Sequence, residues 1–184
     1  MKQRRIQMAA AVAIVSIVSV VATTAVAGDG KNAKAKLIGY EEVPSVSTVA
    51  SGKFSAKIDR SAQRIDYRLS FEDLEANSLF AHIHLGQRTA NGGVSVFLCG
   101  GGDKPPCPVT SGTVEGTIDP ADVIGPTSQG IAPGEFDELV RAIRAGVTYA
   151  NVHSSKFPGG EIRGQIDGRD DDDDGDDDDD GDDD

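Results

Sequence analysis

The chain has 184 residues, of which 38% are hydrophobic, and its formal net charge at pH 7 is −12. Fourteen Asp and one Arg in residues 167–184 contribute −13, and residues 1–27 contribute +3, so residues 28–166 carry only −2. This nearly neutral segment has no basic patch and no aromatic residues interleaved with basic ones, which excludes nucleic acid as an expected partner. Its length suits one domain with a proper core.

The first 27 residues have the layout of a secretory signal peptide. Lys2, Arg4 and Arg5 form a basic start, an apolar stretch follows, and Ala25-Val26-Ala27 provides an A-x-A cleavage site. The alternative is an uncleaved membrane anchor, because roughly 20 apolar residues nearly span a bilayer. In both cases we expect the rest of the chain outside the cytoplasm, either secreted or at the cell surface or in the periplasm. No membrane span is expected after cleavage.

Period-two alternation dominates the chain beyond a linker at residues 28–34. In residues 64–71, Ile65, Tyr67, Leu69 and Phe71 alternate with polar side chains, so one face of the strand is expected to be buried. Short strands separated by Gly, Pro and Asp are typical of an antiparallel β-sandwich or barrel. The other runs that we expect to form strands are 52–59, 78–85, 93–98, 112–119, 147–153 and 160–166.

Residues 133–146 have helical spacing instead. Phe136, Leu139, Val140 and Ile143 form an apolar stripe, and Gly146 follows as a cap. We expect a short helix that packs over one end or edge of the sandwich.

Cys99 and Cys107 flank the glycine-rich segment GGGDKPP. An isolated cysteine pair in an exported protein predicts a disulfide rather than a metal site. This bond would close a short loop and contribute about 2–3 kcal/mol to stability.

All three histidines lie in strand-like runs. His82 and His84 are separated by one residue in AHIHLG, and His153 lies in YANVHSS. Because strand side chains alternate between faces, His82 and His84 share the non-core face of their strand, and His153 takes the non-core face of its own. If the two strands pair side by side, the three rings can hold one ion, and three imidazoles suit Zn²⁺ or Cu²⁺. Ring nitrogens within about 4 Å of one another would favour a metal.

The alternative is a structural network without metal. His82 and His84 would then hydrogen-bond to the backbone or to neighbouring polar groups, and would hold a loop over the sheet. Asn151, Glu161 and Arg163 lie on the polar side of the last two strands and are the expected supporting residues. A salt bridge between Glu161 and Arg163 or Arg64 is the expected role of that carboxylate.

Several motifs resemble the CHRD domain, the module named from chordin. They are AHIHLG, LVRAIRAG and the closing stretch NVHSSKFPGGEIRGQI. KLIGYEEVPSVSTVASGKFSAKID is similar to the family's opening, in which a G-x-x-E-V-P turn precedes the first strand. The resemblance covers residues 35–166 and implies an exported, immunoglobulin-like β-domain without an established general activity. The loop HLGQRTANGG departs from the family's HIHGPA form.

The histidines are also similar in order to the copper site of Cu/Zn superoxide dismutases. That site uses an H-x-H strand and a later His on the outer face of a Greek-key barrel, where His82, His84 and His153 would correspond. The chain has no bridging histidine and no zinc-loop ligands, so the resemblance implies copper binding rather than dismutation. No nucleophile elbow, phosphate loop or carboxylate pair stands out, and no catalytic residue is predicted.

Residues 167–184 are expected to be disordered, because a dense block of Asp repels itself and has nothing to bury. Ca²⁺ prefers carboxylate oxygens, so weak, diffuse Ca²⁺ binding is the most that this tail should show. The spaced ligands and final Glu of an EF-hand loop are missing.

These observations predict a signal peptide (1–27), a linker (28–34), a CHRD-like domain (35–166) and a disordered Asp-rich tail (167–184). The predicted fold is all-β, an antiparallel β-sandwich of Greek-key, immunoglobulin-like type with one short helix. The predicted function is a binding or structural module for an extracytoplasmic partner that the sequence does not identify. The alternative is a copper or zinc metalloprotein with three His ligands and redox activity.

Overall fold

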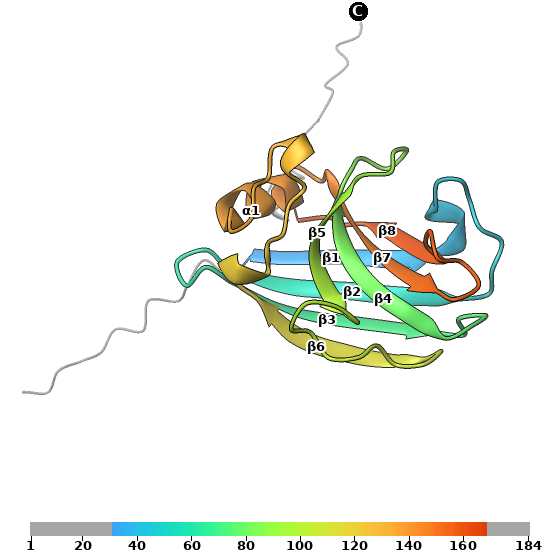
Figure 1. The fold of residues 1–184 in the computed structure, drawn as a ribbon. Coiled ribbons are helices and arrows are strands. Elements are labelled where there is room, and N and C mark those ends of the chain that lie inside the picture. Colours follow the sequence, from blue (N-terminus) through green and yellow to red (C-terminus); the bar gives the residue numbers. More distant parts are fainter. Residues whose placement is uncertain (1–30, 169–184) are drawn as a thin grey trace, which may run out of the picture.

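The computed structural model describes residues 31–168, so the predicted signal peptide and all but the first two residues of the predicted tail lie outside the described residues. Eight strands form one antiparallel sheet in the order β5-β4-β7-β8-β1-β2-β3-β6 (Figure 1). The strands are β1 (Lys31–Ile38), β2 (Ser51–Asp59), β3 (Arg64–Glu72), β4 (Ser78–Leu85), β5 (Gly93–Cys99), β6 (Gly112–Ile118), β7 (Thr148–Ser154) and β8 (Ile162–Gln165). Within residues 31–168, no helix has the length and apolar character needed to cross a membrane.

The sheet curls until its two edge strands, β5 and β6, approach each other (Figure 1). Tyr67 on β3 bridges the two halves, because its hydroxyl donates to the carbonyl of Leu98 on β5 at 2.7 Å. Burial raises the pKa of Tyr67 to about 12, so the hydroxyl keeps the proton that it donates. The prediction of an all-β antiparallel fold with one helix is confirmed.

The core lies inside the curled sheet and is made from alternate residues of every strand. Strand β3 shows the pattern most clearly, because Ile65, Tyr67, Leu69 and Phe71 are buried and the residues between them are not. Ala81 and Ile83 of β4 and Ala150 and Val152 of β7 belong to the same core.

Strand β1 was missing from the sequence-based prediction. The resemblance placed the G-x-x-E-V-P turn before the first strand, but β1 precedes this turn and pairs with β2 along its whole length. Its buried positions, Ala33 and Leu37, alternate with exposed Lys34 and Lys36. Alanine is small and lysine is depleted in strands, so this run gives a weak strand signal.

Helix α1 (Phe136–Arg144) lies at one end of the curled sheet, as predicted (Figure 1). Its apolar stripe of Phe136, Leu139, Val140 and Ile143 is buried. Gly146 ends the helix with a positive φ of 66° and donates its amide hydrogen to the Ile143 carbonyl at 3.0 Å. Three short 3-10 helices, η1 (Gly39–Glu41), η2 (Pro120–Asp122) and η3 (Thr127–Gln129), lie in the connecting loops.

The predicted disulfide between Cys99 and Cys107 is confirmed, with eight residues of sequence separation. It ties the end of β5 to the loop that leads toward β6. Cys99 is fully buried, so the bond anchors this loop to the core.

Chain order and sheet order differ in a way that sets the position of the histidines. The chain crosses between β3 and β4 and again between β6 and β7, and β7 therefore lies between β4 and β8. His82 and His153 are about 70 residues apart in sequence, but this order places them on adjacent strands.

Tyr67→Phe should lower the free energy of unfolding by about 1 kcal/mol, because it removes a buried hydrogen bond that joins β3 to β5. Urea unfolding monitored by circular dichroism measures the change. Tyr40→Phe is the matched control, because the Tyr40 ring is exposed, and its stability should equal that of the wild type. Equal stability of the Tyr67 variant would show that the bridge contributes nothing to closure of the sheet.

Candidate metal centre

The pairing of β4 with β7 brings the three histidines together. In this register Phe80 lies opposite His153, His82 opposite Asn151, and His84 opposite Tyr149. His153 is therefore a diagonal neighbour of His82, which is within reach of long and aromatic side chains. The sequence-based condition that the strand of His153 lies beside residues 79–85 is met.

Irregular pairing on the other side of β4 also affects this face. The register between β4 and β5 shifts between Ala81 and His82 and again between Ile83 and His84. Such bulges bend a strand and redirect its side chains, and they are common beside functional sites.

The imidazoles point away from the hydrophobic core, as alternation predicts, but they are not exposed to solvent. Ala81, Ile83, Ala150 and Val152 fill the core side of β4 and β7. His82, His84 and His153 are nevertheless only 5%, 8% and 6% exposed. Loops fold over this outer face, so it forms a second buried layer made of polar and aromatic groups.

The three rings are packed against one another. One nitrogen from each ring lies within 4.8 Å of the other two. The shortest separation is 3.2 Å, between Nδ1 of His82 and Nε2 of His153. The ring of His82 packs edge-on against that of His84, with 5.3 Å between the centroids.

Two backbone carbonyls fix the orientation of His84 and His153. Nδ1 of His84 lies 3.0 Å from the carbonyl oxygen of Gly92, and Nδ1 of His153 lies 3.0 Å from that of Pro158. A carbonyl oxygen only accepts, so each Nδ1 carries the proton and each Nε2 is left with a lone pair. The same arrangement orients metal-binding histidines in proteins.

Two ring nitrogens in this cluster are buried without a partner. They are Nε2 of His84 and Nε2 of His82. Because the lone pair of His153 already faces Nδ1 of His82, that nitrogen of His82 donates a proton when no ion is bound. The Nε2 lone pairs of His82 and His84 then remain buried acceptors with no donor, and a metal ion would satisfy such a lone pair.

Burial keeps all three imidazoles neutral. It lowers the pKa of His82 to about 3, with further lowering from His153 and His84. It lowers the pKa of His84 to about 4 against the opposing effect of the Gly92 carbonyl, and it also lowers the pKa of His153. Neutral imidazole is the form that binds metal, so protons do not compete for these nitrogens at neutral pH.

Aromatic rings enclose the cluster. Phe80 contacts both His82 and His153, with 5.0 Å between ring centroids in each pair, and Phe97 lies 4.5 Å from His82. Tyr149 stacks on His84 with an interplanar angle of 2° and 4.8 Å between centroids. These rings shield the imidazoles from bulk solvent, in agreement with their low exposure.

Arg163 supports the cluster through Tyr149. Its guanidinium lies 3.4 Å from the centroid of the Tyr149 ring, on which His84 stacks. It also donates to the carbonyls of Gln87 and Ala90, at 2.9 and 3.0 Å. Arg163 thereby ties the 86–92 loop, which supplies the Gly92 carbonyl, over the histidines. Burial lowers the pKa of this guanidinium.

Asn151, which lies opposite His82 in the register, is bound to Glu42, a residue that the sequence did not single out for the site. The Asn151 amide donates to Oε1 of Glu42 at 2.6 Å and to the Ile162 carbonyl at 3.1 Å. Burial raises the pKa of Glu42 to about 7, against the lowering effects of Asn151 and Arg163. The only sequence signal for Glu42 is its place in the G-x-x-E-V-P turn.

Glu161, the third expected supporting residue, is placed elsewhere. Its Oε1 accepts hydrogen bonds from the Thr48 hydroxyl and the Glu75 amide, both at 2.9 Å. Glu161 therefore joins two loops, and it forms no ion pair with Arg163 or Arg64 among the interactions of the described residues. The expected salt bridge is replaced by a bridge between loops.

Fitting an ion requires the rings to draw together slightly. Two nitrogens bound to one ion at about 2.0–2.1 Å are at most about 4.2 Å apart. The observed 4.8 Å limit exceeds this value and also the separation of about 4 Å expected from the sequence, so the rings must draw together before one ion can bind all three. Both hydrogen-bonded rings are held by loop carbonyls, which can follow such a movement.

In a chelator-treated sample, stability should rise between about pH 4.5 and 6.5. The unfolded chain binds protons on three histidines whose folded pKa values are depressed, whereas the folded chain keeps one extra proton on Glu42. The histidines contribute their full stability above about pH 6.5, and this contribution is lost as pH falls. The contribution of Glu42 has the opposite sign of pH dependence, because it is lost as pH rises toward about 7.

Urea unfolding at several pH values measures this slope. Glu42→Gln removes the opposing contribution and should steepen the rise by up to about 1.4 kcal/mol per pH unit. Glu72→Gln, at an exposed position, is the control and should leave the slope unchanged. A flat or falling stability over this range would contradict neutral burial of the imidazoles.

Comparison with known proteins identifies a family. The family model described as CHRD domain matches residues 33–166, which is more than half of the chain. No curated protein and no solved structure matches the chain. The Cys99–Cys107 disulfide agrees with the extracytoplasmic location that this family implies. The resemblance noted in the sequence is confirmed, and the chain belongs to the CHRD domain family.

Proposed function

We propose that this CHRD-domain protein is an extracytoplasmic metal-binding module that holds a copper or zinc ion through His82, His84 and His153. One observation carries the proposal: one nitrogen from each of the three imidazoles lies within 4.8 Å of the other two, and Nε2 of His84 is buried without a partner. A buried acceptor without a donor is unfavourable by about 1–3 kcal/mol, and coordination to an ion would remove that cost.

The chemistry of the donors supports copper or zinc. Imidazole nitrogen suits both ions, and hard cations such as Ca²⁺ and Mg²⁺ prefer oxygen. The Nδ1–H bonds of His84 and His153 to backbone carbonyls orient the two rings and make Nε2 a better donor. The aromatic walls leave the imidazoles little exposed to solvent, and a low local dielectric strengthens the interaction between an ion and its ligands.

The enclosure of the site favours an ion that is held rather than one that acts on a large substrate. Catalytic metal sites keep a coordination position open to substrate or water. Here the three ligands are nearly buried, and the 86–92 loop and the Pro158 loop lie over them. We therefore favour a structural or electron-transfer role in a protein that is secreted or retained at the cell surface or in the periplasm.

The competing function is a module without metal that binds an extracytoplasmic partner. In this case the histidines only link strands and loops, through His82 to His153 and through the carbonyls of Gly92 and Pro158. The two functions differ in one measurable property, which is the uptake of one equivalent of metal by the imidazoles.

The full chain should bind one Cu²⁺ per molecule with an electron paramagnetic resonance signal split by nitrogen ligands. His84→Ala and His153→Ala should each lose this signal, because each removes a ligand from a site with only three. A competing chelator of moderate affinity removes ions from the Asp-rich tail, which is identical in all three proteins. Equal copper uptake with the same nitrogen signal in wild type and His84→Ala would refute the site.

Gly92→Ala tests the support of His84 without touching a ligand. A Cβ at this position would collide with the carbonyl of Leu85, so the 86–92 loop must shift and take the Gly92 acceptor away from His84. We expect the copper affinity to fall about 10–100-fold, as for other lost partners of metal-binding histidines. Gly159→Ala is the matched control, because a Cβ there meets open space, and its affinity should equal that of the wild type. Unchanged affinity in the Gly92 variant would show that this carbonyl does not support the site.

A further inference from the structure

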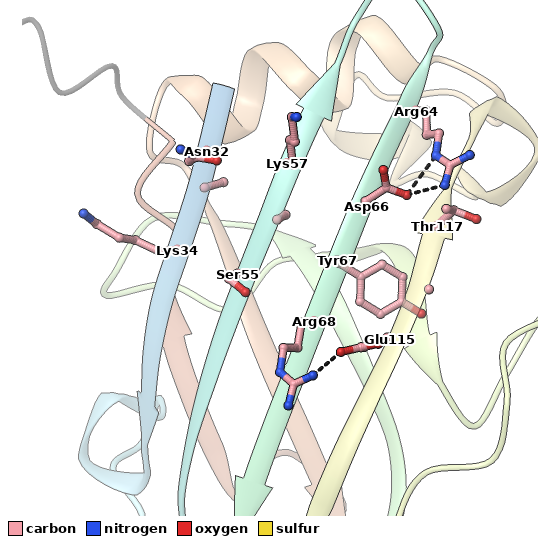
Figure 2. A pocket seen from close by; sticks show the side chains of 13 residues that line it. Asn32, Lys34, Ser55, Lys57, Arg64, Asp66, Tyr67, Arg68, Glu115 and Thr117 are labelled. Atoms are coloured by element: carbon pink, nitrogen blue, oxygen red, sulfur yellow. Dashed lines mark hydrogen bonds and ion pairs between the residues drawn. The ribbon is translucent and has the colours of Figure 1, made fainter. Parts of the chain in front are cut away.

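The outer face of β1, β2, β3 and β6 is open and rich in positive charge. Two hollows of about 760 and 610 Å³ run along it and share Lys34, Ser55 and Arg68; Figure 2 shows the first. We call this surface the cationic face. Its charged lining residues are Lys34, Lys36, Lys53, Lys57, Arg64, Arg68, Asp66, Glu115 and Asp167.

Acidic neighbours compensate only part of this charge. Arg64 pairs with Asp66 at 2.6 Å, and Arg68 pairs with Glu115 (Figure 2). Lys36 and Lys53 lie directly opposite each other on β1 and β2, and neither forms an ion pair within residues 31–168. Like charges in directly opposed positions destabilise a sheet, so an anion lying across these strands would be favourable.

We propose that the Asp-rich segment 170–184 of the same chain lies across the cationic face. The point where the chain leaves the domain supports this occupant. Asp167 is bound to Lys34 of β1 by two backbone hydrogen bonds, of 2.9 and 2.8 Å, and it also lines the second hollow. The acidic segment therefore starts at the rim of the cationic face.

The length of the segment is sufficient. Sixteen residues follow Gly168, and an extended chain of this length spans up to about 55 Å. Four neighbouring strands at about 4.8 Å spacing are less than about 20 Å across. Because the segment is tethered, its effective concentration at the face is of millimolar order, so even weak attraction keeps it there.

The distribution of charge favours this contact over other surfaces of the domain. Thirteen Asp follow Gly168, and residues 28–166 are close to neutral as a whole. The cationic face therefore concentrates positive charge that is balanced elsewhere on the domain. Contacts between exposed charges weaken with salt, because the screening length falls from about 10 Å at 0.1 M to about 3 Å at 1 M.

A nitroxide label at the end of the full chain tests the contact. In low salt, label on Asp184→Cys should weaken the amide resonances of Lys36 and Lys53 relative to its reduced form, and 1 M NaCl should restore them. Lys53→Glu should reduce the weakening of these resonances. Lys156→Glu makes an equal charge change on the loop between β7 and β8 and should not reduce it. No weakening in low salt, or an equal loss in both variants, would overturn the proposal.

Heparin, a sulfated polyanion, distinguishes an occupied face from an open one. Replacing the ten Asp of 170–174 and 176–180 with Asn should delay elution of the full chain from a heparin column. Adding Lys53→Glu to that variant should reverse the delay, and adding Lys156→Glu should reverse it less. If the wild type elutes as late as the Asn variant, the face is open to outside polyanions and the tail does not occupy it.

Discussion

The antiparallel register between β4 and β7 is the constraint on which the candidate metal centre depends. It sets Phe80 opposite His153 and His84 opposite Tyr149, and it leaves Ala81 and Ile83 facing the core. A slip by one residue would turn every side chain of a strand to the other face and move the imidazoles into the core. The apolar positions of β4 and β7 fix the register, because any other pairing would bury polar groups among Ile, Val and Leu. The polar cluster is therefore positioned by the hydrophobic residues on the opposite side of the same strands.

The outer faces of the two halves of the curled sheet differ in what covers them. Over β4, β7 and β8, three long-range contacts pull loops onto the sheet: Arg163 to the 86–92 loop, Asn151 to Glu42, and Glu161 to Thr48. Burial beneath these loops lowers the pKa values of the three histidines and raises that of Glu42. Over β1, β2 and β3, lysines and arginines line the two hollows on the outer face. The same sheet thus carries a buried polar cluster on the outer face of β4, β7 and β8, and a charged surface on the outer face of β1, β2 and β3.

Much of the fold follows from local patterns, and much of the site does not. The alternation of Ile65, Tyr67 and Leu69 predicts β3, and the helical stripe around Leu139 predicts α1, because each pattern records burial against one core. The same alternation places the histidines away from that core. It cannot predict that loops cover them, because Arg163 and Asn151 make those contacts over long sequence separations. For the same reason the place of Glu42 was not foreseen, and Glu161 was assigned to the wrong partners.

The geometry also explains how an ion would act on the domain. The ligand nitrogens spread over more than one ion can bridge, so binding requires rings of the cluster, such as those of His84 and His153, to move inward. Each of these rings is bonded to a carbonyl in a loop rather than in a strand, at Gly92 and Pro158. Movement of the ring therefore draws the loop with it, and Arg163 transmits the shift across the 86–92 loop through its bonds to Gln87 and Ala90. An ion at this position would tighten the loops over β4 and β7 more than the sheet itself, because the sheet is already held by its own core.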